Sequence, residues 1–74
     1  MVKYSDLSGN SGVEAYDIGN NYIKIRFKGG DVYLYSYAKP GKRHVEEMKH
    51  LATIGKGLAT YISRNIKNRF EAKL

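Results

Sequence analysis

One alternating segment between two glycine turns constrains the fold of this chain more than any other feature. Apolar and charged side chains alternate through residues 22–28, a period typical of a strand that buries one face. Residues 19–21 (Gly-Asn-Asn) precede it and residues 29–30 (Gly-Gly) follow it, and both sets tolerate the positive φ angles of tight hairpin turns. The neighbouring residues 13–18 and 31–37 contain β-branched and aromatic residues, which strands prefer. The sequence therefore predicts a three-stranded antiparallel meander.

The register of the second hairpin decides which side chains share a face of this meander. If residues 29–30 form a two-residue loop, Phe27 pairs with Val32, and paired residues lie on the same face. A three-residue loop would break this separation. The predicted core face carries Ile23, Ile25, Phe27, Val32 and Leu34, joined by Tyr16 and Ile18 from the first strand. The opposite face is predicted to interleave tyrosines with cations: Tyr22, Lys24, Arg26, Tyr33, Tyr35 and Tyr37.

Two amphipathic helices are predicted after the meander. Pro40 suits a first helical turn, and apolar residues recur at helical spacing over residues 40–52 and again over residues 57–70. The apolar stripes consist of Val45, Met48 and Leu51/Ala52 in the first helix and of Leu58, Ile62, Ile66 and Phe70 in the second. Both stripes need an apolar partner, and the core face of the meander is the only large one. We therefore expect an α+β fold of order β-β-β-α-α, with both helices on one face.

Composition separates residues 1–12 from the rest of the chain. These residues are rich in Ser, Gly, Asn and Asp, which bury little apolar area, so we expect a flexible N-terminal arm followed by a single domain over residues 13–74. Cysteine is absent, so no disulfide can stabilise the fold. No apolar run approaches the roughly 20 residues that span a bilayer. We expect a soluble, cytoplasmic protein with no membrane partner.

The positive charge of the chain lies entirely in its second half. The net charge is +6 at pH 7, yet the four cations of residues 1–38 are matched by four carboxylates. Residues 39–74 carry nine cations and three carboxylates. Such a one-sided excess favours polyanionic partners, nucleic acid above all, although a lysine-rich helical surface needs no partner to explain it.

The residues named above resemble those of the KTSC family, a small domain found at the C-terminus of some lysyl-tRNA synthetases and as a single-domain protein. The family pattern of Tyr-Asp, alternating strand, Gly turn, Tyr-x-Tyr, Pro and Ser-x-Gly is matched by Tyr16-Asp17, Ile23, Ile25, Phe27, Gly30, Tyr33-Leu34-Tyr35, Pro40 and Thr53-Ile54-Gly55. The similarity covers residues 11–66. Ala59 stands where the family has an Asn after the glycine, so an anion site built on that Asn is not expected. The resemblance implies the fold predicted above, and RNA binding has been suggested for the family.

The tyrosine-and-cation face is the main candidate site. Bases stack on aromatic rings while cations take the phosphates, so Tyr22, Lys24, Arg26, Tyr33, Tyr35 and Tyr37 are predicted to bind nucleic acid. Two other interpretations stay open. Tyrosine is a good strand residue in its own right, and exposed rings also suit a homodimer interface.

The turn between the helices offers a second candidate. Residues 53–57 (Thr-Ile-Gly-Lys-Gly) open the second helix, where amide groups, the helix dipole and Lys56 can hold a phosphate, although an ordinary interhelical turn explains the same residues. Among the cations of the second half, Lys56 and Arg64 are predicted to contact the phosphates of a nucleic acid. His44 and His50 are six residues apart on the first helix and point in different directions, so they cannot share a metal. The sequence also lacks a nucleophile with an adjacent base. We expect no enzyme activity, no metal and no cofactor.

Together these features predict a small accessory domain that binds nucleic acid, with RNA favoured over DNA. The alternative is a homo-oligomeric or protein-interaction module with no nucleic-acid role.

Overall fold

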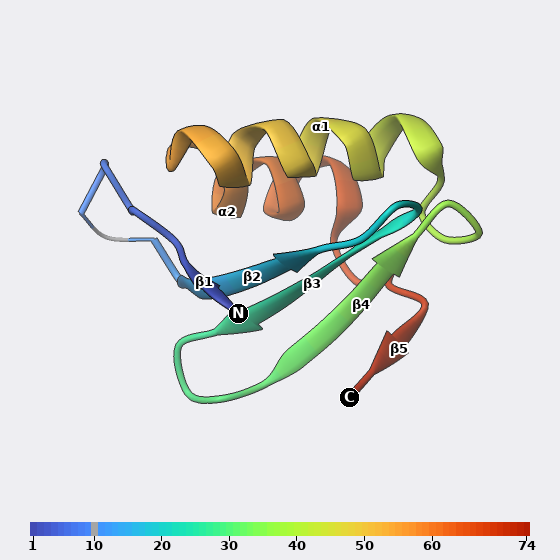
Figure 1. The fold of residues 1–74 in the computed structure, drawn as a ribbon, viewed down its shortest axis with the longest axis horizontal. Coiled ribbons are helices and arrows are strands. Elements are labelled where there is room, and N and C mark those ends of the chain that lie inside the picture. The colour runs from blue at the N-terminus through green and yellow to red at the C-terminus, as the bar shows by residue number, and fades with distance from the viewer. Residues whose placement is uncertain (10) are drawn as a thin grey trace.

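The computed structural model describes residues 1–9 and 11–74, and it has an α+β fold of two layers. The elements in chain order are β1 (Val2–Lys3), β2 (Val13–Ile18), β3 (Tyr22–Phe27), β4 (Val32–Ser36), α1 (Lys42–Ile54), α2 (Leu58–Tyr61), the π-helical η1 (Ile62–Ile66) and β5 (Ala72–Lys73). The strands form one antiparallel sheet in the order β1-β2-β3-β4-β5, and the helices lie over one face of it (Figure 1). The predicted class is confirmed, but the sheet has five strands instead of three.

The central meander and the helical stripes follow the sequence pattern closely. Strands β2, β3 and β4 occupy the three predicted segments and pair as consecutive antiparallel neighbours. The helical residues that face the sheet are fully or almost fully buried: Val45, Met48, Ala52, Leu58, Ile62 and Ile66. They pack against Ile23 and Ile25 of β3, which are 0% exposed. The apolar periodicity of each segment is therefore the pattern that builds the core.

The register of the β3–β4 hairpin differs by one residue from the predicted one. The amide of Phe27 donates to the carbonyl of Asp31 at 2.8 Å, which leaves residues 28–30 as a three-residue loop. The ladder consequently pairs Ile23 with Tyr35 and Ile25 with Tyr33, while Val32 and Leu34 pair with the charged residues of β3. The prediction of a two-residue loop at residues 29–30 is wrong, and so is the assignment of β4 to the two faces.

Side-chain size explains why the tyrosines of β4 take the inner positions. Both alternating sets of this strand are apolar enough for a core, because Val32 and Leu34 alternate with Tyr33 and Tyr35. The rings bury more area than the aliphatic side chains do. Tyr35 is only 2% exposed and belongs to the core, and Tyr33 packs against it. One face of the sheet, called the open face from here on, is left without helices and carries Tyr22, Lys24, Arg26, Val32 and Leu34.

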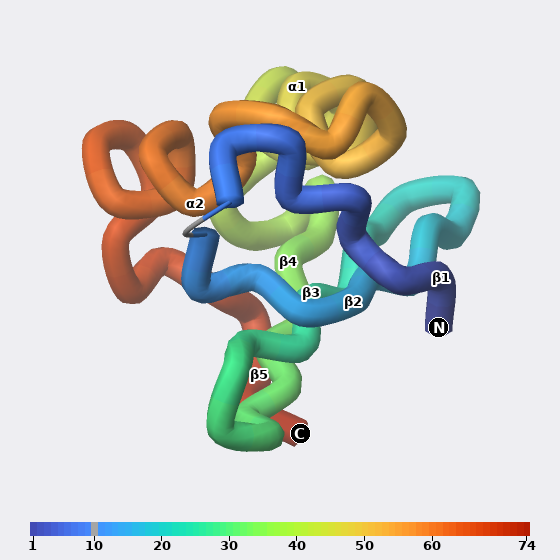
Figure 2. Tube along the Cα trace, turned by 90° about the vertical axis from the view of Figure 1, so that its left-hand side faces the viewer, coloured from blue at the N-terminus to red at the C-terminus, as the bar shows by residue number. Residues whose placement is uncertain are grey.

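The N-terminal segment is part of the folded domain, which corrects the prediction of a flexible arm over residues 1–12. Strand β1 pairs with β2, and the Tyr4 side chain is 2% exposed. Its hydroxyl accepts a hydrogen bond from the amide of Leu58 at 3.3 Å. Figure 2 shows the blue segment leaving β1, rising to the helices and returning to β2. Asn10, which belongs to the predicted arm, lies outside the described residues.

The second helix ends earlier than predicted, and the chain then returns to the sheet. Lys67 has a φ of 56°, and its amide donates to the carbonyl of Ile62 at 2.6 Å, which closes the π-helical turn of η1. Residues 67–71 then cross to the sheet edge, where β5 pairs with β4. The prediction of a helix through Phe70 is therefore wrong. Phe70 leaves the helix and packs its ring against Tyr33, with 4.6 Å between the centroids.

The corner between α1 and α2 lies at Gly55, and two features of this position require a glycine. Its φ of 76° lies in the left-handed region, and its amide donates to the carbonyls of Leu51 and Ala52 to close α1. A Cβ atom here would lie 2.6 Å from the Cβ of Ser5. The carbonyl of Gly55 also accepts a hydrogen bond from the amide of Leu7 at 2.8 Å. The corner is thus the point at which the N-terminal segment is held.

Candidate nucleic-acid interface

The predicted tyrosine-and-cation face does not exist as one surface. Only Tyr22, Lys24 and Arg26 lie together on the open face. Tyr33 and Tyr35 lie on the opposite face and contribute to the core, so they cannot stack bases beside these cations. The physical reason is the one-residue difference in register, which moves every side chain of β4 to the other face of the sheet.

Tyr37 is held against helix α1 and is not part of an open platform either. Its hydroxyl donates to a carboxylate oxygen of Glu46 at 2.6 Å, and Glu46 also accepts from Lys49 at 2.8 Å. The bond to Glu46 raises the pKa of Tyr37, while Lys49 and Tyr37 together lower the pKa of Glu46. The Lys49 ammonium lies 5.6 Å from the centre of the Tyr37 ring. Tyr37 therefore joins the end of β4 to α1.

The cations of the open face are balanced by carboxylates. The guanidinium of Arg26 forms an ion pair with Glu14 at 2.6 Å. Lys24 lies opposite Asp17 in the ladder, and its ammonium is 5.5 Å from the centre of the Tyr22 ring. The remaining part of this face is aliphatic, with Val32 and Leu34. An anionic ligand would meet little uncompensated positive charge here.

The turn over residues 53–57 has few free donors for an anion. The amides of Gly55 and Lys56 already donate to carbonyls of α1, and the amide of Leu58 donates to Tyr4. The hydroxyl of Thr53 donates to the carbonyl of Lys49 at 2.8 Å and does not cap the next helix. Lys56 is exposed, and it lies in a turn whose geometry is explained by the helix corner alone.

The side chains of His44 and His50 are not brought together. The His44 Nδ1 atom lies 2.7 Å from the Tyr61 hydroxyl, and His50 is exposed. Within residues 1–9 and 11–74, no three His, Cys, Asp or Glu side chains group as a metal ion would require. No helix in this part of the chain combines the length and apolarity needed to cross a bilayer.

Four aromatic rings cluster where the β3–β4 hairpin meets the segment after η1. Phe27 and Tyr33 meet edge to face with centroids 5.6 Å apart, and Tyr35 and Phe70 meet the same way at 6.4 Å. Tyr33 and Phe70 make the closest contact, at 4.6 Å. Tyr35 is buried, whereas the other three rings are only partly covered. The cluster therefore completes the core on one side and presents aromatic surface on the other.

This aromatic surface lines a hollow of about 350 Å³, called the aromatic hollow from here on. Its floor consists of the four rings, Phe27, Tyr33, Tyr35 and Phe70, together with the buried Ile62, and three exposed polar residues, Asp31, Lys67 and Asn68, complete its lining. The Lys73 ammonium lies 5.8 Å from the centre of the Tyr33 ring and 3.7 Å from a carboxylate oxygen of Asp31. The floor suits a planar apolar group, and the polar residues can bind the edge of that group.

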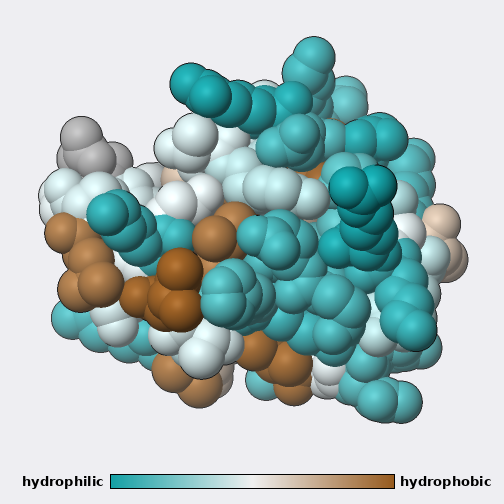
Figure 3. All heavy atoms as spheres, turned by 90° about the horizontal axis from the view of Figure 1, so that it is seen from above, coloured by the Kyte–Doolittle hydropathy of each residue, from teal (hydrophilic) through white to brown (hydrophobic). Residues whose placement is uncertain are grey.

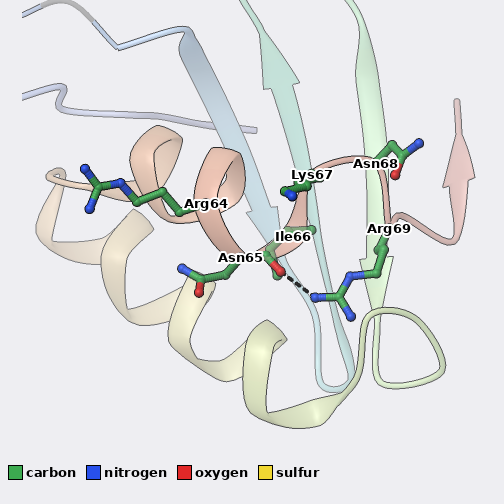
Figure 4. A pocket seen from close by; sticks show the side chains of 6 residues that line it. All are labelled: Arg64, Asn65, Ile66, Lys67, Asn68 and Arg69. Carbon is green, nitrogen blue, oxygen red and sulfur yellow. Dashed lines mark hydrogen bonds between the residues drawn. The ribbon is translucent and has the colours of Figure 1, made fainter.

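A second hollow of about 350 Å³ adjoins the first and is called the basic hollow. It is lined by residues 64–69, among which Arg64, Lys67 and Arg69 are cationic and none is acidic. Figure 4 shows Arg64 pointing away from the other labelled residues, whereas the Arg69 side chain turns back toward Asn65. The Arg69 guanidinium donates a hydrogen bond to the carbonyl of Asn65. This bond holds the cation at the C-terminus of η1, where the helix dipole favours positive charge.

Lys67 and Asn68 line both hollows, so the two form one continuous surface. The early end of η1 creates it, because residues 67–70 can lie over the hairpin only after leaving the helix. Of the residues predicted to bind nucleic acid, Arg64 lines the basic hollow, and Tyr33 and Tyr35 form part of the aromatic floor. Sequence reasoning missed Phe27, Lys67, Asn68, Arg69 and Phe70. The run Lys67-Asn68-Arg69-Phe70, in which an aromatic residue follows cations and an amide, is the signal that could have found most of them.

The pH dependence of stability reports whether Tyr35 belongs to the core. Burial, with a smaller contribution from Tyr33, raises the pKa of Tyr35 from 10.0 to about 12. The neutral phenol is therefore favoured in the folded state. Its contribution to stability is complete below pH 10 and is lost as the pH rises toward about 12. In urea unfolding measured across this interval, we expect the Tyr35→Phe variant to lose less stability than the wild-type protein. An equal loss in both proteins would contradict the buried position of Tyr35.

No family model, curated protein or solved structure matches the chain.

Proposed function

We propose that this domain binds single-stranded nucleic acid, with RNA as the favoured class, through the joined aromatic and basic hollows. The observation that carries the proposal is the partly exposed aromatic cluster beside a hollow that is lined by three cations and no carboxylate. Single-stranded nucleic acid is bound by surfaces that offer aromatic rings to the bases and cations to the phosphates. RNA is favoured because proteins recognise it chiefly through unpaired, splayed bases.

Two further features support the same proposal. The excess positive charge of the chain lies in residues 39–74, which include the whole basic hollow. The resemblance to the KTSC family, found attached to some lysyl-tRNA synthetases, fits an accessory domain that works beside RNA. We also propose, from the same sequence resemblance, that this chain is a member of the KTSC family.

The salt dependence of binding tests which surface takes the phosphates. On single strands, the slope of log affinity against log salt is about −0.7 for each phosphate contact. The double variant Arg64→Gln/Lys67→Gln removes two exposed cations of the basic hollow, so the slope should flatten by roughly 1.4. The measurement is a titration of a labelled, mixed-sequence single-stranded RNA at several salt concentrations.

The matched control is Lys24→Gln/Arg26→Gln, which removes the same charge from the open face. Because Glu14 and Asp17 neighbour these cations, we expect a smaller change in slope. A larger change in the control would move the interface to the open face. If the wild-type domain shows no affinity at low salt, the nucleic-acid function is wrong.

One observation favours a second function, a homo-oligomeric or protein-interaction module. Leu7 and Ile54 are 69% and 46% exposed, and the hydrogen bond from Leu7 to Gly55 brings their backbones together. In Figure 3, hydrophobic atoms gather at this end of an otherwise largely hydrophilic helical surface. Exposed apolar groups of this kind mark interaction surfaces when they are contiguous. A sedimentation mass above that of the 8.4 kDa chain, lowered by Ile54→Lys, would support this second function.

A further inference from the structure

We propose that the aromatic hollow holds one unpaired nucleobase while Lys67 binds the phosphate attached to it, an inference that rests on the proposed function. The volume of about 350 Å³ lies at the lower end of the range for small-molecule sites, which begins near 300 Å³. A hollow of this size can hold a single base, and a base must leave its own stack before it can lie on protein rings. The ligand class is therefore a nucleotide that is not base-paired, in a loop, a bulge or a strand end.

The floor of the hollow is aromatic, and its rings are tilted against one another by 43° to 89°, so that it offers both ring faces and ring edges to a base. Phe27, Tyr33 and Phe70 keep part of their surface uncovered, and each is fixed by contact with another ring of the cluster. Tyr35, buried behind them, leaves the floor no room to collapse inward. A base entering the hollow meets aromatic surface that is already ordered, so little side-chain freedom is lost on binding.

The distribution of charge around the two hollows determines the orientation of a bound nucleotide. The aromatic hollow carries both signs of charge, because the Asp31 carboxylate in its lining lies 3.7 Å from the Lys73 ammonium, whereas the basic hollow has three cations and no carboxylate among its lining residues. Lys67 lines both hollows and makes no ion pair with any of the described residues 1–9 and 11–74. Arg69 is already engaged with the carbonyl of Asn65. The phosphate therefore belongs on the side of Lys67, and the base edge on the side of Asp31.

The polar residues around the aromatic floor also favour particular bases. The Asp31 carboxylate offers acceptor oxygens, and the Asn68 amide can both donate and accept. Adenine, cytosine and guanine carry an exocyclic amino group that a carboxylate can accept from, and uracil does not. The hollow should therefore prefer amino-bearing bases over uracil.

A chemical-shift titration with mononucleotides tests the site directly. The probes are adenosine monophosphate, uridine monophosphate, adenosine and inorganic phosphate. We expect adenosine monophosphate to shift the amide signals of residues 67–70 and 31–33, and to bind about tenfold more tightly than uridine monophosphate. Adenosine should shift the same signals but bind more weakly, and phosphate alone should leave residues 31–33 unchanged.

Two exposed substitutions separate the roles of base and phosphate. Lys67→Gln should reduce the affinity for adenosine monophosphate to that for adenosine, while the matched variant Lys24→Gln should not. Asp31→Ala, which leaves no acceptor oxygen at this position, should abolish the preference for adenine over uracil. Melting temperatures close to that of the wild-type protein confirm that these variants fold.

The outcomes distinguish this inference from the proposed function. If single-stranded RNA binds while adenosine monophosphate shifts no signal at residues 67–70 or 31–33, the nucleotide site is wrong and the function stands. If the mononucleotide binds there while RNA does not, the site stands and the nucleic-acid function is wrong. Shifts confined to the open face would overturn the site as well.

Discussion

Replacing Tyr35 with alanine is expected to lower the free energy of unfolding by about 3–5 kcal/mol, the usual cost of removing a large buried ring. The side chain is 2% exposed and packs edge to face on Phe70, and it lies opposite Ile23 in the ladder. A chain of 74 residues has a total stability of roughly 4–11 kcal/mol at typical values per residue. The variant should therefore be partly or fully unfolded at room temperature, as measured by circular dichroism during urea titration.

Leu34→Ala is the matched control for this prediction. Leu34 precedes Tyr35 in the same strand but lies on the open face, opposite Lys24. Its truncation should cost less than half as much, because the side chain is only half-buried. With the two-residue loop predicted from the sequence, the order would be reversed. A larger loss of stability for Leu34→Ala would therefore support the register predicted from the sequence, and with it the predicted tyrosine-and-cation face.

Replacing Tyr4 with alanine is expected to destabilise the domain by a comparable amount, about 3–5 kcal/mol. The ring is 2% exposed and belongs to the core cluster, although it precedes the meander by nine residues. Its hydroxyl also accepts the hydrogen bond from the first amide of α2, so removal leaves that donor unpaired. Urea unfolding of the purified variant measures the loss.

Two further variants separate the ring from its hydroxyl and from the rest of the segment. Tyr4→Phe keeps the ring and loses the hydrogen bond, which should cost about 1 kcal/mol. Leu7→Ala removes a side chain that is 69% exposed and should change stability by no more than about 0.5 kcal/mol. If Tyr4→Ala were equally harmless, residues 1–9 would be an arm outside the fold after all.

Local patterns made the central elements predictable from the sequence. The alternation in β3, the glycine turns and the apolar stripes of α1 and α2 each depend on residues close together in the chain. Strands β1 and β5 have two residues each and no alternation, so nothing local marks them. They exist because their backbones complete the hydrogen bonding of β2 and β4. Pairing of this kind is decided by tertiary structure.

The candidate site was harder to predict because it depends on two choices that local patterns do not make. In β4, Val-Tyr-Leu-Tyr supports either face assignment, and the competition between ring and aliphatic burial decides it. After Ile66, Phe70 fits the helical stripe by spacing, yet it packs on Tyr33 instead. A helix continuing through Phe70 would have left the aromatic rings and Lys67 apart. The sequence shows the excess of positive charge in residues 39–74, but it does not show that some of these cations lie beside the aromatic rings.

The contact between the N-terminal segment and the Gly55 corner has a consequence for the order of folding. The β2–β3–β4 meander closes short loops, and such local contacts form quickly. The hydrogen bond between Tyr4 and Leu58 joins residues 54 positions apart, so it closes a loop that includes most of the 74-residue chain. Because loop-closure entropy must be overcome before a distant contact stabilises anything, this closure comes late. A contact that forms only after the folding transition state affects mainly the rate of unfolding. Loss of the Tyr4 contact should therefore speed up unfolding and leave the rate of folding nearly unchanged.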